Sequence, residues 1–137
     1  MKIAIDFDGT IVEDKYPEIG RPQMFVFQAL KELQKEHRLI LWTCREGKLL
    51  DDAVEFCKKN GIEFYAVNRN FPEEEYSEKD FMRKLDADMF IDDRNFGGFP
   101  GWSEIYQKIS NKAVEAPKKK NGFGRNKLCL KSFFQML

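Results

Sequence analysis

Two aspartates separated by one residue stand near the start of the sequence, at the end of an apolar stretch. Asp6 and Asp8 follow residues 3–5, and Gly9 comes directly after them. Side chains two positions apart on an extended chain point the same way, so both carboxylates are expected to face one small site while Phe7 turns to the opposite layer. Because two neighbouring carboxylates repel each other, the pair predicts a bound cation.

Two further apolar stretches also end on polar side chains. Residues 89–91 lead into Asp92 and Asp93, and residues 39–42 lead into Thr43. The carboxyl ends of parallel strands meet at one edge of a sheet, so these groups are expected to lie close to the first acidic pair. Two alternatives remain open: the acids at 92–93 could cap a helix, and Thr43 with Glu46 could form a capping box.

The elements that must position these groups alternate between strand and helix patterns. Apolar runs predict strands over 3–7, 39–43, 63–67 and 89–94, and helical periodicity predicts helices opened by Pro22 and ending near 36–37, over 46–60, and from near Ser103. Such alternation is typical of a three-layer, Rossmann-like α/β fold with a parallel sheet. The gaps after the first and third strands leave room for a flap or loop, but not for a separate cap domain.

The run Asp6-Phe7-Asp8-Gly9-Thr10 resembles motif I of the haloacid dehalogenase (HAD) superfamily of phosphohydrolases. Thr43 resembles motif II, Lys84 the lysine of motif III, and Asp92-Asp93 motif IV. The run Asp92-Asp93-Arg94-Asn95, with the later glycines and Trp102, is similar to that of small capless members and extends the resemblance over residues 1–112. The resemblance implies a HAD-like catalytic domain over residues 1–116.

The resemblance implies a phosphatase that works through an aspartyl-phosphate. It implies that Asp6 is the nucleophile and a metal ligand, and that Asp8 is the proton donor and then the base, with its main-chain carbonyl on the metal. Asp92 would be the other protein ligand, and Asp93 would bind metal-held water or orient its neighbours. Thr43 and Lys84 would bind the transferring oxygens. Ligands that are all oxygen, without His or Cys, favour Mg²⁺.

Several alternatives stay open at the level of the residues. Asp8-Gly9 alone is also typical of a turn between two strands. A receiver-type domain would place its acids next to each other, which the spacing of Asp6 and Asp8 does not match. Lys84 could be an exposed cation at a helix end, with Arg83 or Lys79 in its place. Arg94 could steady an acid or a phosphate or make a structural pair, and Cys44 could be an oxidisable thiol or a packed one.

Composition narrows the class of protein. The 137 residues, 42% of them hydrophobic and 13 of them Phe, suit one domain with a real core. Residues 1–116 carry a net charge of −6, which disfavours nucleic acid as a partner. Residues 117–137 carry a net charge of +6 and are expected to form a basic linker followed by an amphipathic helix. Three cysteines without C-x-x-C spacing indicate reduced thiols and a cytoplasmic protein, and no apolar run has membrane length.

The expected partner is therefore a phosphorylated substrate whose identity the residues do not name. Without a cap domain the crevice should be open, and a large substrate, the basic tail or a second copy in a homo-oligomer could cover it. The alternative function is a non-catalytic protein that senses phosphate or acts as a scaffold while keeping the fold and the metal site.

Overall fold

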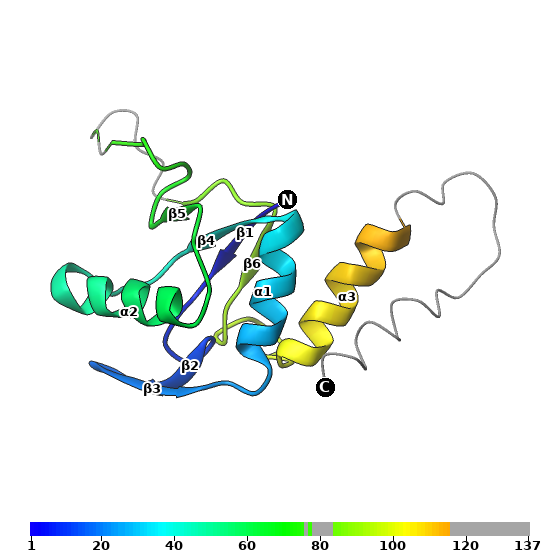
Figure 1. The fold of residues 1–137 in the computed structure, drawn as a ribbon, viewed down its shortest axis with the longest axis horizontal. Helices are drawn as coiled ribbons and strands as arrows, with labels where there is room; N and C mark the ends of the chain where they lie inside the picture. Colours follow the sequence, from blue (N-terminus) through cyan, green and yellow to red (C-terminus); the bar gives the residue numbers. More distant parts are fainter. Residues whose placement is uncertain (76, 78–83, 116–137) are drawn as a thin grey trace.

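Strands and helices alternate along the part of the chain that the structure, a computed structural model, describes: residues 1–75, 77 and 84–115 (Figure 1). In chain order the elements are β1 (Lys2–Ile5), β2 (Val12–Lys15), β3 (Glu18–Pro22), α1 (Val26–Glu36), β4 (Arg38–Leu41), α2 (Gly47–Lys59), β5 (Ala66–Val67), β6 (Met89–Ile91) and α3 (Trp102–Glu115).

The main sheet is parallel, and β1 lies inside it. Its strand order is β5-β4-β1-β6. Ile5 at the end of β1 pairs with Leu41 of β4 on one side and with Ile91 of β6 on the other, so three strands end at the same level. The chain moves from β1 to one side and later returns to the other, and crevices of parallel sheets form at such reversals. The expected α/β class with a parallel sheet is confirmed.

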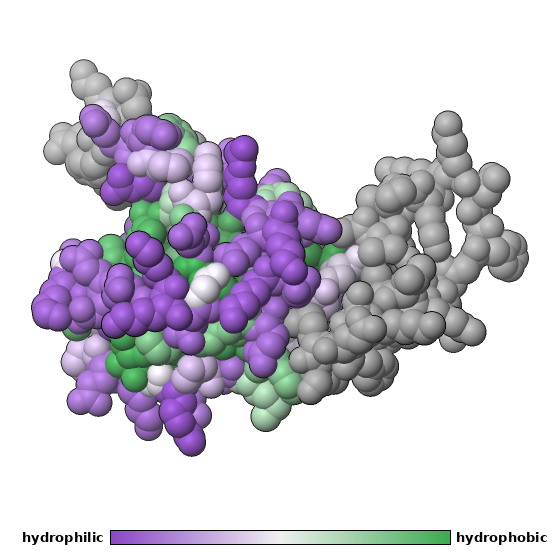
Figure 2. Space-filling view, viewed as in Figure 1, coloured by the Kyte–Doolittle hydropathy of each residue, from purple (hydrophilic) through white to green (hydrophobic). Residues whose placement is uncertain are grey.

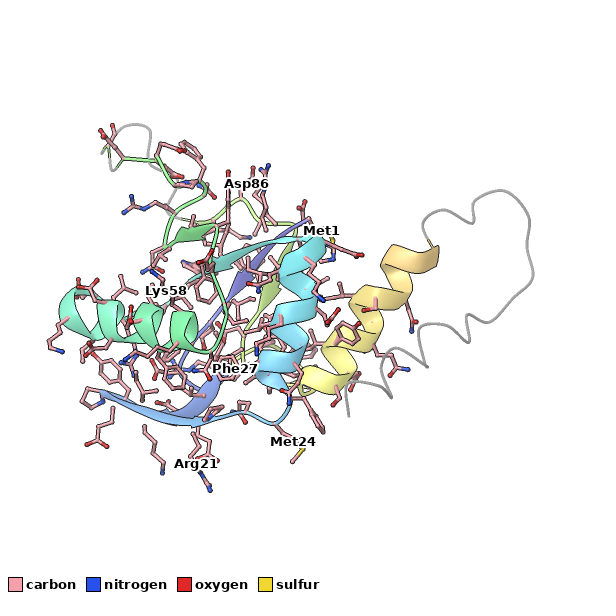
Figure 3. All side chains as sticks on the ribbon, viewed as in Figure 1. Met1, Arg21, Met24, Phe27, Lys58 and Asp86 are labelled. Atoms are coloured by element: carbon pink, nitrogen blue, oxygen red, sulfur yellow. The ribbon has the colours of Figure 1, made fainter. Side chains whose placement is uncertain are left out.

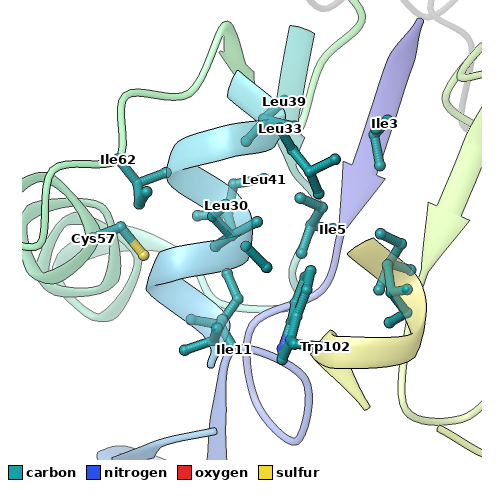
Figure 4. Close-up of a cluster of buried hydrophobic side chains, with 14 of the residues drawn as sticks. Ile3, Ile5, Ile11, Leu30, Leu33, Leu39, Leu41, Cys57, Ile62 and Trp102 are labelled. Atoms are coloured by element: carbon teal, nitrogen blue, oxygen red, sulfur yellow. The ribbon is translucent and has the colours of Figure 1, made fainter. Parts of the chain in front are cut away.

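One face of the sheet is covered by the three helices. Alternate residues of the strands, such as Ile3 and Ile5, join Leu30 and Leu33 of α1 and the buried Trp102 of α3 in one hydrophobic cluster (Figure 4). Cys57 brings α2 into the same cluster, and its burial raises the pKa of its thiol to about 12. The interpretation of Cys57 as a core residue is confirmed.

The opposite face carries a second, smaller cluster. Ala4, Ile40 and Ala66 of the strands meet Leu85, with Phe90 packed against them. The connection from β5 to β6 crosses this face, and its described residues contain no helix. The expected third layer is thus represented by loop in the described part of the chain, and residues 76 and 78–83 of that connection lie outside it.

A two-stranded hairpin, β2–β3, separates β1 from α1 and protrudes from the carboxyl edge of the sheet (Figure 1). This hairpin is the flap that the short gap after the first strand predicted. The prediction that Pro22 opens the first helix is wrong, because Pro22 ends β3 opposite Val12, at the edge of a two-stranded sheet where proline is tolerated. Arg21 projects from β3 toward the exterior (Figure 3).

Apart from the start of α1, the helix ends follow the sequence patterns closely, whereas the strand ends do not. α1 ends at Glu36 and α2 runs from 47 to 59, within a residue or so of the expected limits. β5 has two residues in place of the five expected over 63–67, and β1 and β4 stop before their polar ends. The functional side chains therefore stand on loops just beyond the strands.

The surface over α1 and α2 is mostly hydrophilic, with hydrophobic groups visible between the elements (Figure 2). Within the described residues no helix is long and apolar enough to cross a membrane. The linker and amphipathic helix expected over residues 117–137 lie outside the described part of the chain.

Candidate metal and phosphate site

Three carboxylates gather beyond the ends of β1 and β6. Asp6 follows Ile5, and Asp92 follows Ile91, its partner in the sheet, so the two acids emerge side by side. The amide of Asp6 donates to the carbonyl of Ile91 (3.0 Å), which fixes this register. One oxygen from each of Asp6, Asp92 and Asp93 lies within 4.8 Å of the others. The expected convergence of the two acidic strand ends is present.

Thr10 joins the acids from the two strands. Its hydroxyl lies 3.1 Å from an oxygen of Asp6 and 3.2 Å from one of Asp93, and it accepts the amide N–H of Asp93 (2.9 Å). A hydroxyl has one proton, so it donates to one of these carboxylates at a time. The carbonyl of Thr10 accepts the indole N–H of the buried Trp102 (2.8 Å), which ties the start of α3 to this loop.

Gly9 is required by the same loop. Its backbone has a φ of +88°, a left-handed conformation that glycine adopts without strain. A Cβ atom at this position would also overlap with the carboxylate of Asp93. Because Gly9 has no side chain, the carboxylate of Asp93 can lie close to the main chain directly after Asp8.

Among the described residues, none forms an ion pair with the carboxylates of Asp6, Asp92 or Asp93. Burial, followed by the charge of Asp92 and a hydrogen bond with Asp93, raises the pKa of Asp6 from its ordinary 3.8 to about 7. A carboxyl group that holds its proton to neutral pH marks a place where a cation would be stabilising.

The raised pKa of Asp6 predicts how stability depends on pH when metal is absent. The folded protein binds the Asp6 proton more tightly than the unfolded chain, so the stabilisation is complete below about pH 4 and is lost as the pH rises towards about 7. We expect the Tm in a chelator to fall over that range, and Asp6→Asn to remove this component. A wild type and an Asp6→Asn variant with parallel pH profiles would contradict the assignment. Calorimetry measures both.

Asp8 stands apart from the cluster, because its carboxylate is bound by Arg45. The Nε and Nη2 groups of Arg45 donate to the two oxygens of Asp8, each at 2.8 Å. This hydrogen bonding raises the pKa of the guanidinium. The sequence interpretation missed Arg45, whose one available signal was its place two residues after Thr43, at the edge where the strands end.

Thr43 lies at the expected edge but does not cap a helix. Its amide donates to the side chain of Asn68 (2.8 Å), and its hydroxyl accepts the amide of Arg45 (3.1 Å). The N-cap of α2 is Glu46, with no side-chain capping bond, so the capping-box interpretation is wrong. The helix-cap interpretation of Asp92-Asp93 is also wrong, since α3 begins at Trp102.

These groups line a cavity of about 360 Å³. Its lining residues are Asp6, Asp8, Asp14, Tyr16, Thr43, Cys44, Arg45, Asp92 and Arg94. Cys44 is exposed in this cavity and is not a packed core thiol. Arg94 contributes its side chain to the wall, while its amide donates to the carboxylate of Asp92 (2.8 Å).

Lys84 is not among the residues that line the cavity. Its ammonium lies over the ring of Phe90, 5.8 Å from the centroid. Phe90 pairs with Ala4 in the sheet and packs against the second, smaller cluster, so the ammonium of Lys84 lies over that face of the sheet. Arg83 and Lys79, the alternatives, lie outside the described residues.

The donor set suits a hard cation. Among the residues that the structure describes, the group that could hold one ion consists of three carboxylates, with no imidazole or thiolate. Carboxylates are ligands that Mg²⁺ takes, and Mg²⁺ keeps water or substrate oxygens in its remaining positions. The fold and the cluster thus define the chain as an α/β protein with a parallel sheet and an acidic centre at its carboxyl edge.

The chain belongs to the same family as a conserved protein of Bacteroides thetaiotaomicron whose structure has been solved. The two are 54% identical, with a TM-score of 0.76, and the match covers 88% of this chain and 98% of that one. No protein-family model matches the chain, and no curated protein matches it.

Proposed function

We propose that this chain is a HAD-like, Mg²⁺-dependent phosphatase that hydrolyses phosphate monoesters through an aspartyl-phosphate. The observation that carries the proposal is the meeting of Asp6, Asp92 and Asp93 within 4.8 Å, at the wall of a cavity that Asp6 and Asp92 line together with Asp8 and Thr43. Asp6, Asp92 and Asp93 would hold the ion, with the main-chain carbonyl of Asp8. When bound, Mg²⁺ would neutralise the repulsion between these acids and a phosphate dianion.

Asp6 is the proposed nucleophile. A carboxylate oxygen of Asp6 attacks phosphorus, the bond from phosphorus to the leaving oxygen breaks, and the phosphoryl group is then carried on Asp6. Asp8 enters the first step protonated and gives its proton to the leaving oxygen. In the second step it takes a proton from the water that attacks the same phosphorus, which restores the protonated acid. Phosphate leaves, and the carboxylate of Asp6 is restored.

Thr43 is the proposed binder of a phosphate oxygen. Its hydroxyl accepts the amide of Arg45, and the hydroxyl proton remains available to an oxygen in the cavity. Lys84 is a weaker candidate for a second such role, because reaching the cavity would require its ammonium to leave the ring of Phe90.

The experiment is phosphate release from an aryl phosphate with Mg²⁺ added. The proposal expects release that a chelator abolishes and Mg²⁺ restores. Metal-dependent stabilisation without release from any of a panel of metabolite phosphates would favour the alternative, a non-catalytic protein that senses phosphate. The panel would also identify the substrate.

Metal binding can be tested without turnover. We expect Mg²⁺ to raise the Tm by about 3 °C for each kcal/mol of binding free energy, and to do so more strongly above pH 7 than below it, because Asp6 must lose its proton. Asp92→Asn should weaken this response. Asp52→Asn, in an exposed pair with Lys48 on α2, is the matched control and should respond as the wild type does. A melting curve that millimolar Mg²⁺ leaves unchanged would count against the site.

A further inference from the structure

Arg45 is the most completely bonded side chain around the cavity. It is 1% exposed, although it stands on the short turn between β4 and α2. Besides its two bonds to Asp8, its Nη1 donates to the carbonyl of Pro17 (3.1 Å) and its Nη2 to that of Glu18 (2.8 Å). Pro17 lies in the turn of the β2–β3 hairpin, and Glu18 is the first residue of β3. One guanidinium thus binds a site carboxylate and the flap together.

Two aromatic rings hold the plane of this guanidinium. Its central carbon lies 5.1 Å from the centroid of the Phe7 ring and 5.3 Å from that of Tyr16. Phe7 stands between the two motif aspartates, and Tyr16 is in the hairpin, so the rings come from the same two segments that the hydrogen bonds join. Arginine provides a planar fork for such a place, whereas lysine does not.

We propose that Arg45 is a positioning residue that couples the hairpin to Asp8, so that the carboxylate of Asp8 is held in place only while the hairpin is seated against Arg45. The inference rests on the proposed function for its kinetic consequences. A buried cation that loses its carboxylate is costly, so displacement of Asp8 also weakens the anchor of the hairpin. Conversely, displacement of the hairpin removes two acceptors and one ring from Arg45 and loosens Asp8.

The segment between β1 and α1 forms the hairpin and no folded cap. The coupling through Arg45 links substrate entry at this hairpin to proton transfer by Asp8. The hairpin brings Asp14 and Tyr16 to the cavity wall, so a ligand that enters meets the flap as well as the acids. Proton transfer is sensitive to small displacements of the group that makes it. A seated flap therefore corresponds to a correctly placed Asp8.

The kinetic test is a double-mutant cycle with Arg45→Gln and Asp8→Asn on two substrates. The alcohol of an alkyl phosphate needs a proton on its oxygen in order to leave, whereas dinitrophenolate leaves a dinitrophenyl phosphate without one. We expect Arg45→Gln to slow the first step, release of the leaving group in a single turnover, about tenfold or more on the alkyl ester, with a much smaller loss on the aryl ester and little change in the half-saturating substrate concentration. The second step is common to both esters and should slow equally on both. Because Arg45 acts through Asp8, the double variant should be no slower than Asp8→Asn alone.

The outcomes that would overturn the proposal are distinct. Additive losses in the cycle, equal losses in the first step on both esters, or a rise in the half-saturating substrate concentration as the main effect would mean that Arg45 supports the fold or binds phosphate directly. Arg21→Gln is the matched control, since Arg21 is an exposed arginine of the same hairpin that pairs with Glu13 and does not touch Asp8. It should leave both rates unchanged.

A second variant covers the case in which Arg45→Gln does not fold. A Cβ at Gly20 would overlap with the carbonyl of Glu13 across the hairpin, so Gly20→Ala displaces the flap while Arg45 and Asp8 stay intact. It should reproduce the loss in the first step on the alkyl ester and spare the first step on the aryl ester. If Gly20→Ala keeps the wild-type rate on both esters, the coupling is overturned.

Hydrogen exchange tests the coupling without any turnover. In Asp8→Asn, the amides of residues 12–22 should exchange about tenfold faster than in the wild type, while those of β1 and α1 keep their protection. Unchanged hairpin protection would overturn the proposal. If the wild type releases no phosphate from any ester, the proposed function fails, and this measurement still decides whether Asp8 and the hairpin are coupled.

Discussion

Asp6→Asn should abolish phosphate release while making the metal-free protein at least as stable as the wild type. The amide keeps the size of the side chain but cannot act as the nucleophile, so we expect a loss of about a thousandfold or more. The same change removes a carboxylate whose pKa is raised to about 7 by burial and by Asp92, and with it an uncompensated charge. Phosphate release and thermal unfolding in a chelator measure the two effects.

In Asp6→Asn, phosphate release should be lost while thermal stability is kept or raised, and this combination distinguishes loss of the nucleophile from loss of the fold. A variant that is inactive because it is unfolded would lose both properties together. Asp52→Asn is the control for a change of the same chemistry on the surface of α2 and should keep its activity. An Asp6→Asn variant with near-normal turnover would mean that the activity comes from elsewhere in the chain.

Asp8→Asn should separate the two chemical steps. Without a group to take the proton of the attacking water, turnover should fall by about a hundredfold or more. A substrate with a good leaving group can still transfer its phosphoryl group to Asp6, because such a group departs with little protonation. We therefore expect the aspartyl-phosphate to accumulate in this variant and not in Asp6→Asn.

Folding must be checked for this variant, because it leaves the buried Arg45 beside a neutral amide. A lower Tm with an intact spectrum of the folded protein is expected. If Asp8→Asn turns over aryl and alkyl phosphates at the wild-type rate, Asp8 does not transfer protons in the reaction.

The sequence was sufficient for the parallel sheet and for the convergence of the acids. Buried strands are read directly from apolar runs such as residues 3–5, and polar residues at the ends of such runs must meet when the strands are parallel. Asp6, Asp92 and Asp93 therefore followed from local patterns together with one rule about sheets.

The parts that the sequence did not reveal depend on contacts between distant residues. Arg45 and Asp8 are 37 positions apart, and its place two residues after Thr43 does not by itself distinguish Arg45 from a solvated arginine in a turn. Pro22 fits a first helical turn as well as the end of an edge strand, and pairing with Val12 decided between them. The place of Lys84 was likewise set by the ring of Phe90.

The β2–β3 hairpin is the flap beside the cavity. Between β1 and α1 the chain forms this short flap and no folded cap, and the buried Arg45 attaches the flap to the site. We therefore expect ligands that fill the cavity to protect the amides of residues 12–22 from exchange.

The central claim is that Asp6 carries the phosphoryl group, and the most direct measurement is chemical trapping during turnover. The protein is mixed with an aryl phosphate and Mg²⁺, quenched in acid, reduced with borohydride and digested, and the peptide that contains Asp6 is examined by mass spectrometry. The predicted result is reduction of the Asp6 side chain only when substrate and Mg²⁺ are both present. Phosphate release with Asp6 unmodified, or with another residue modified in its place, would contradict the account.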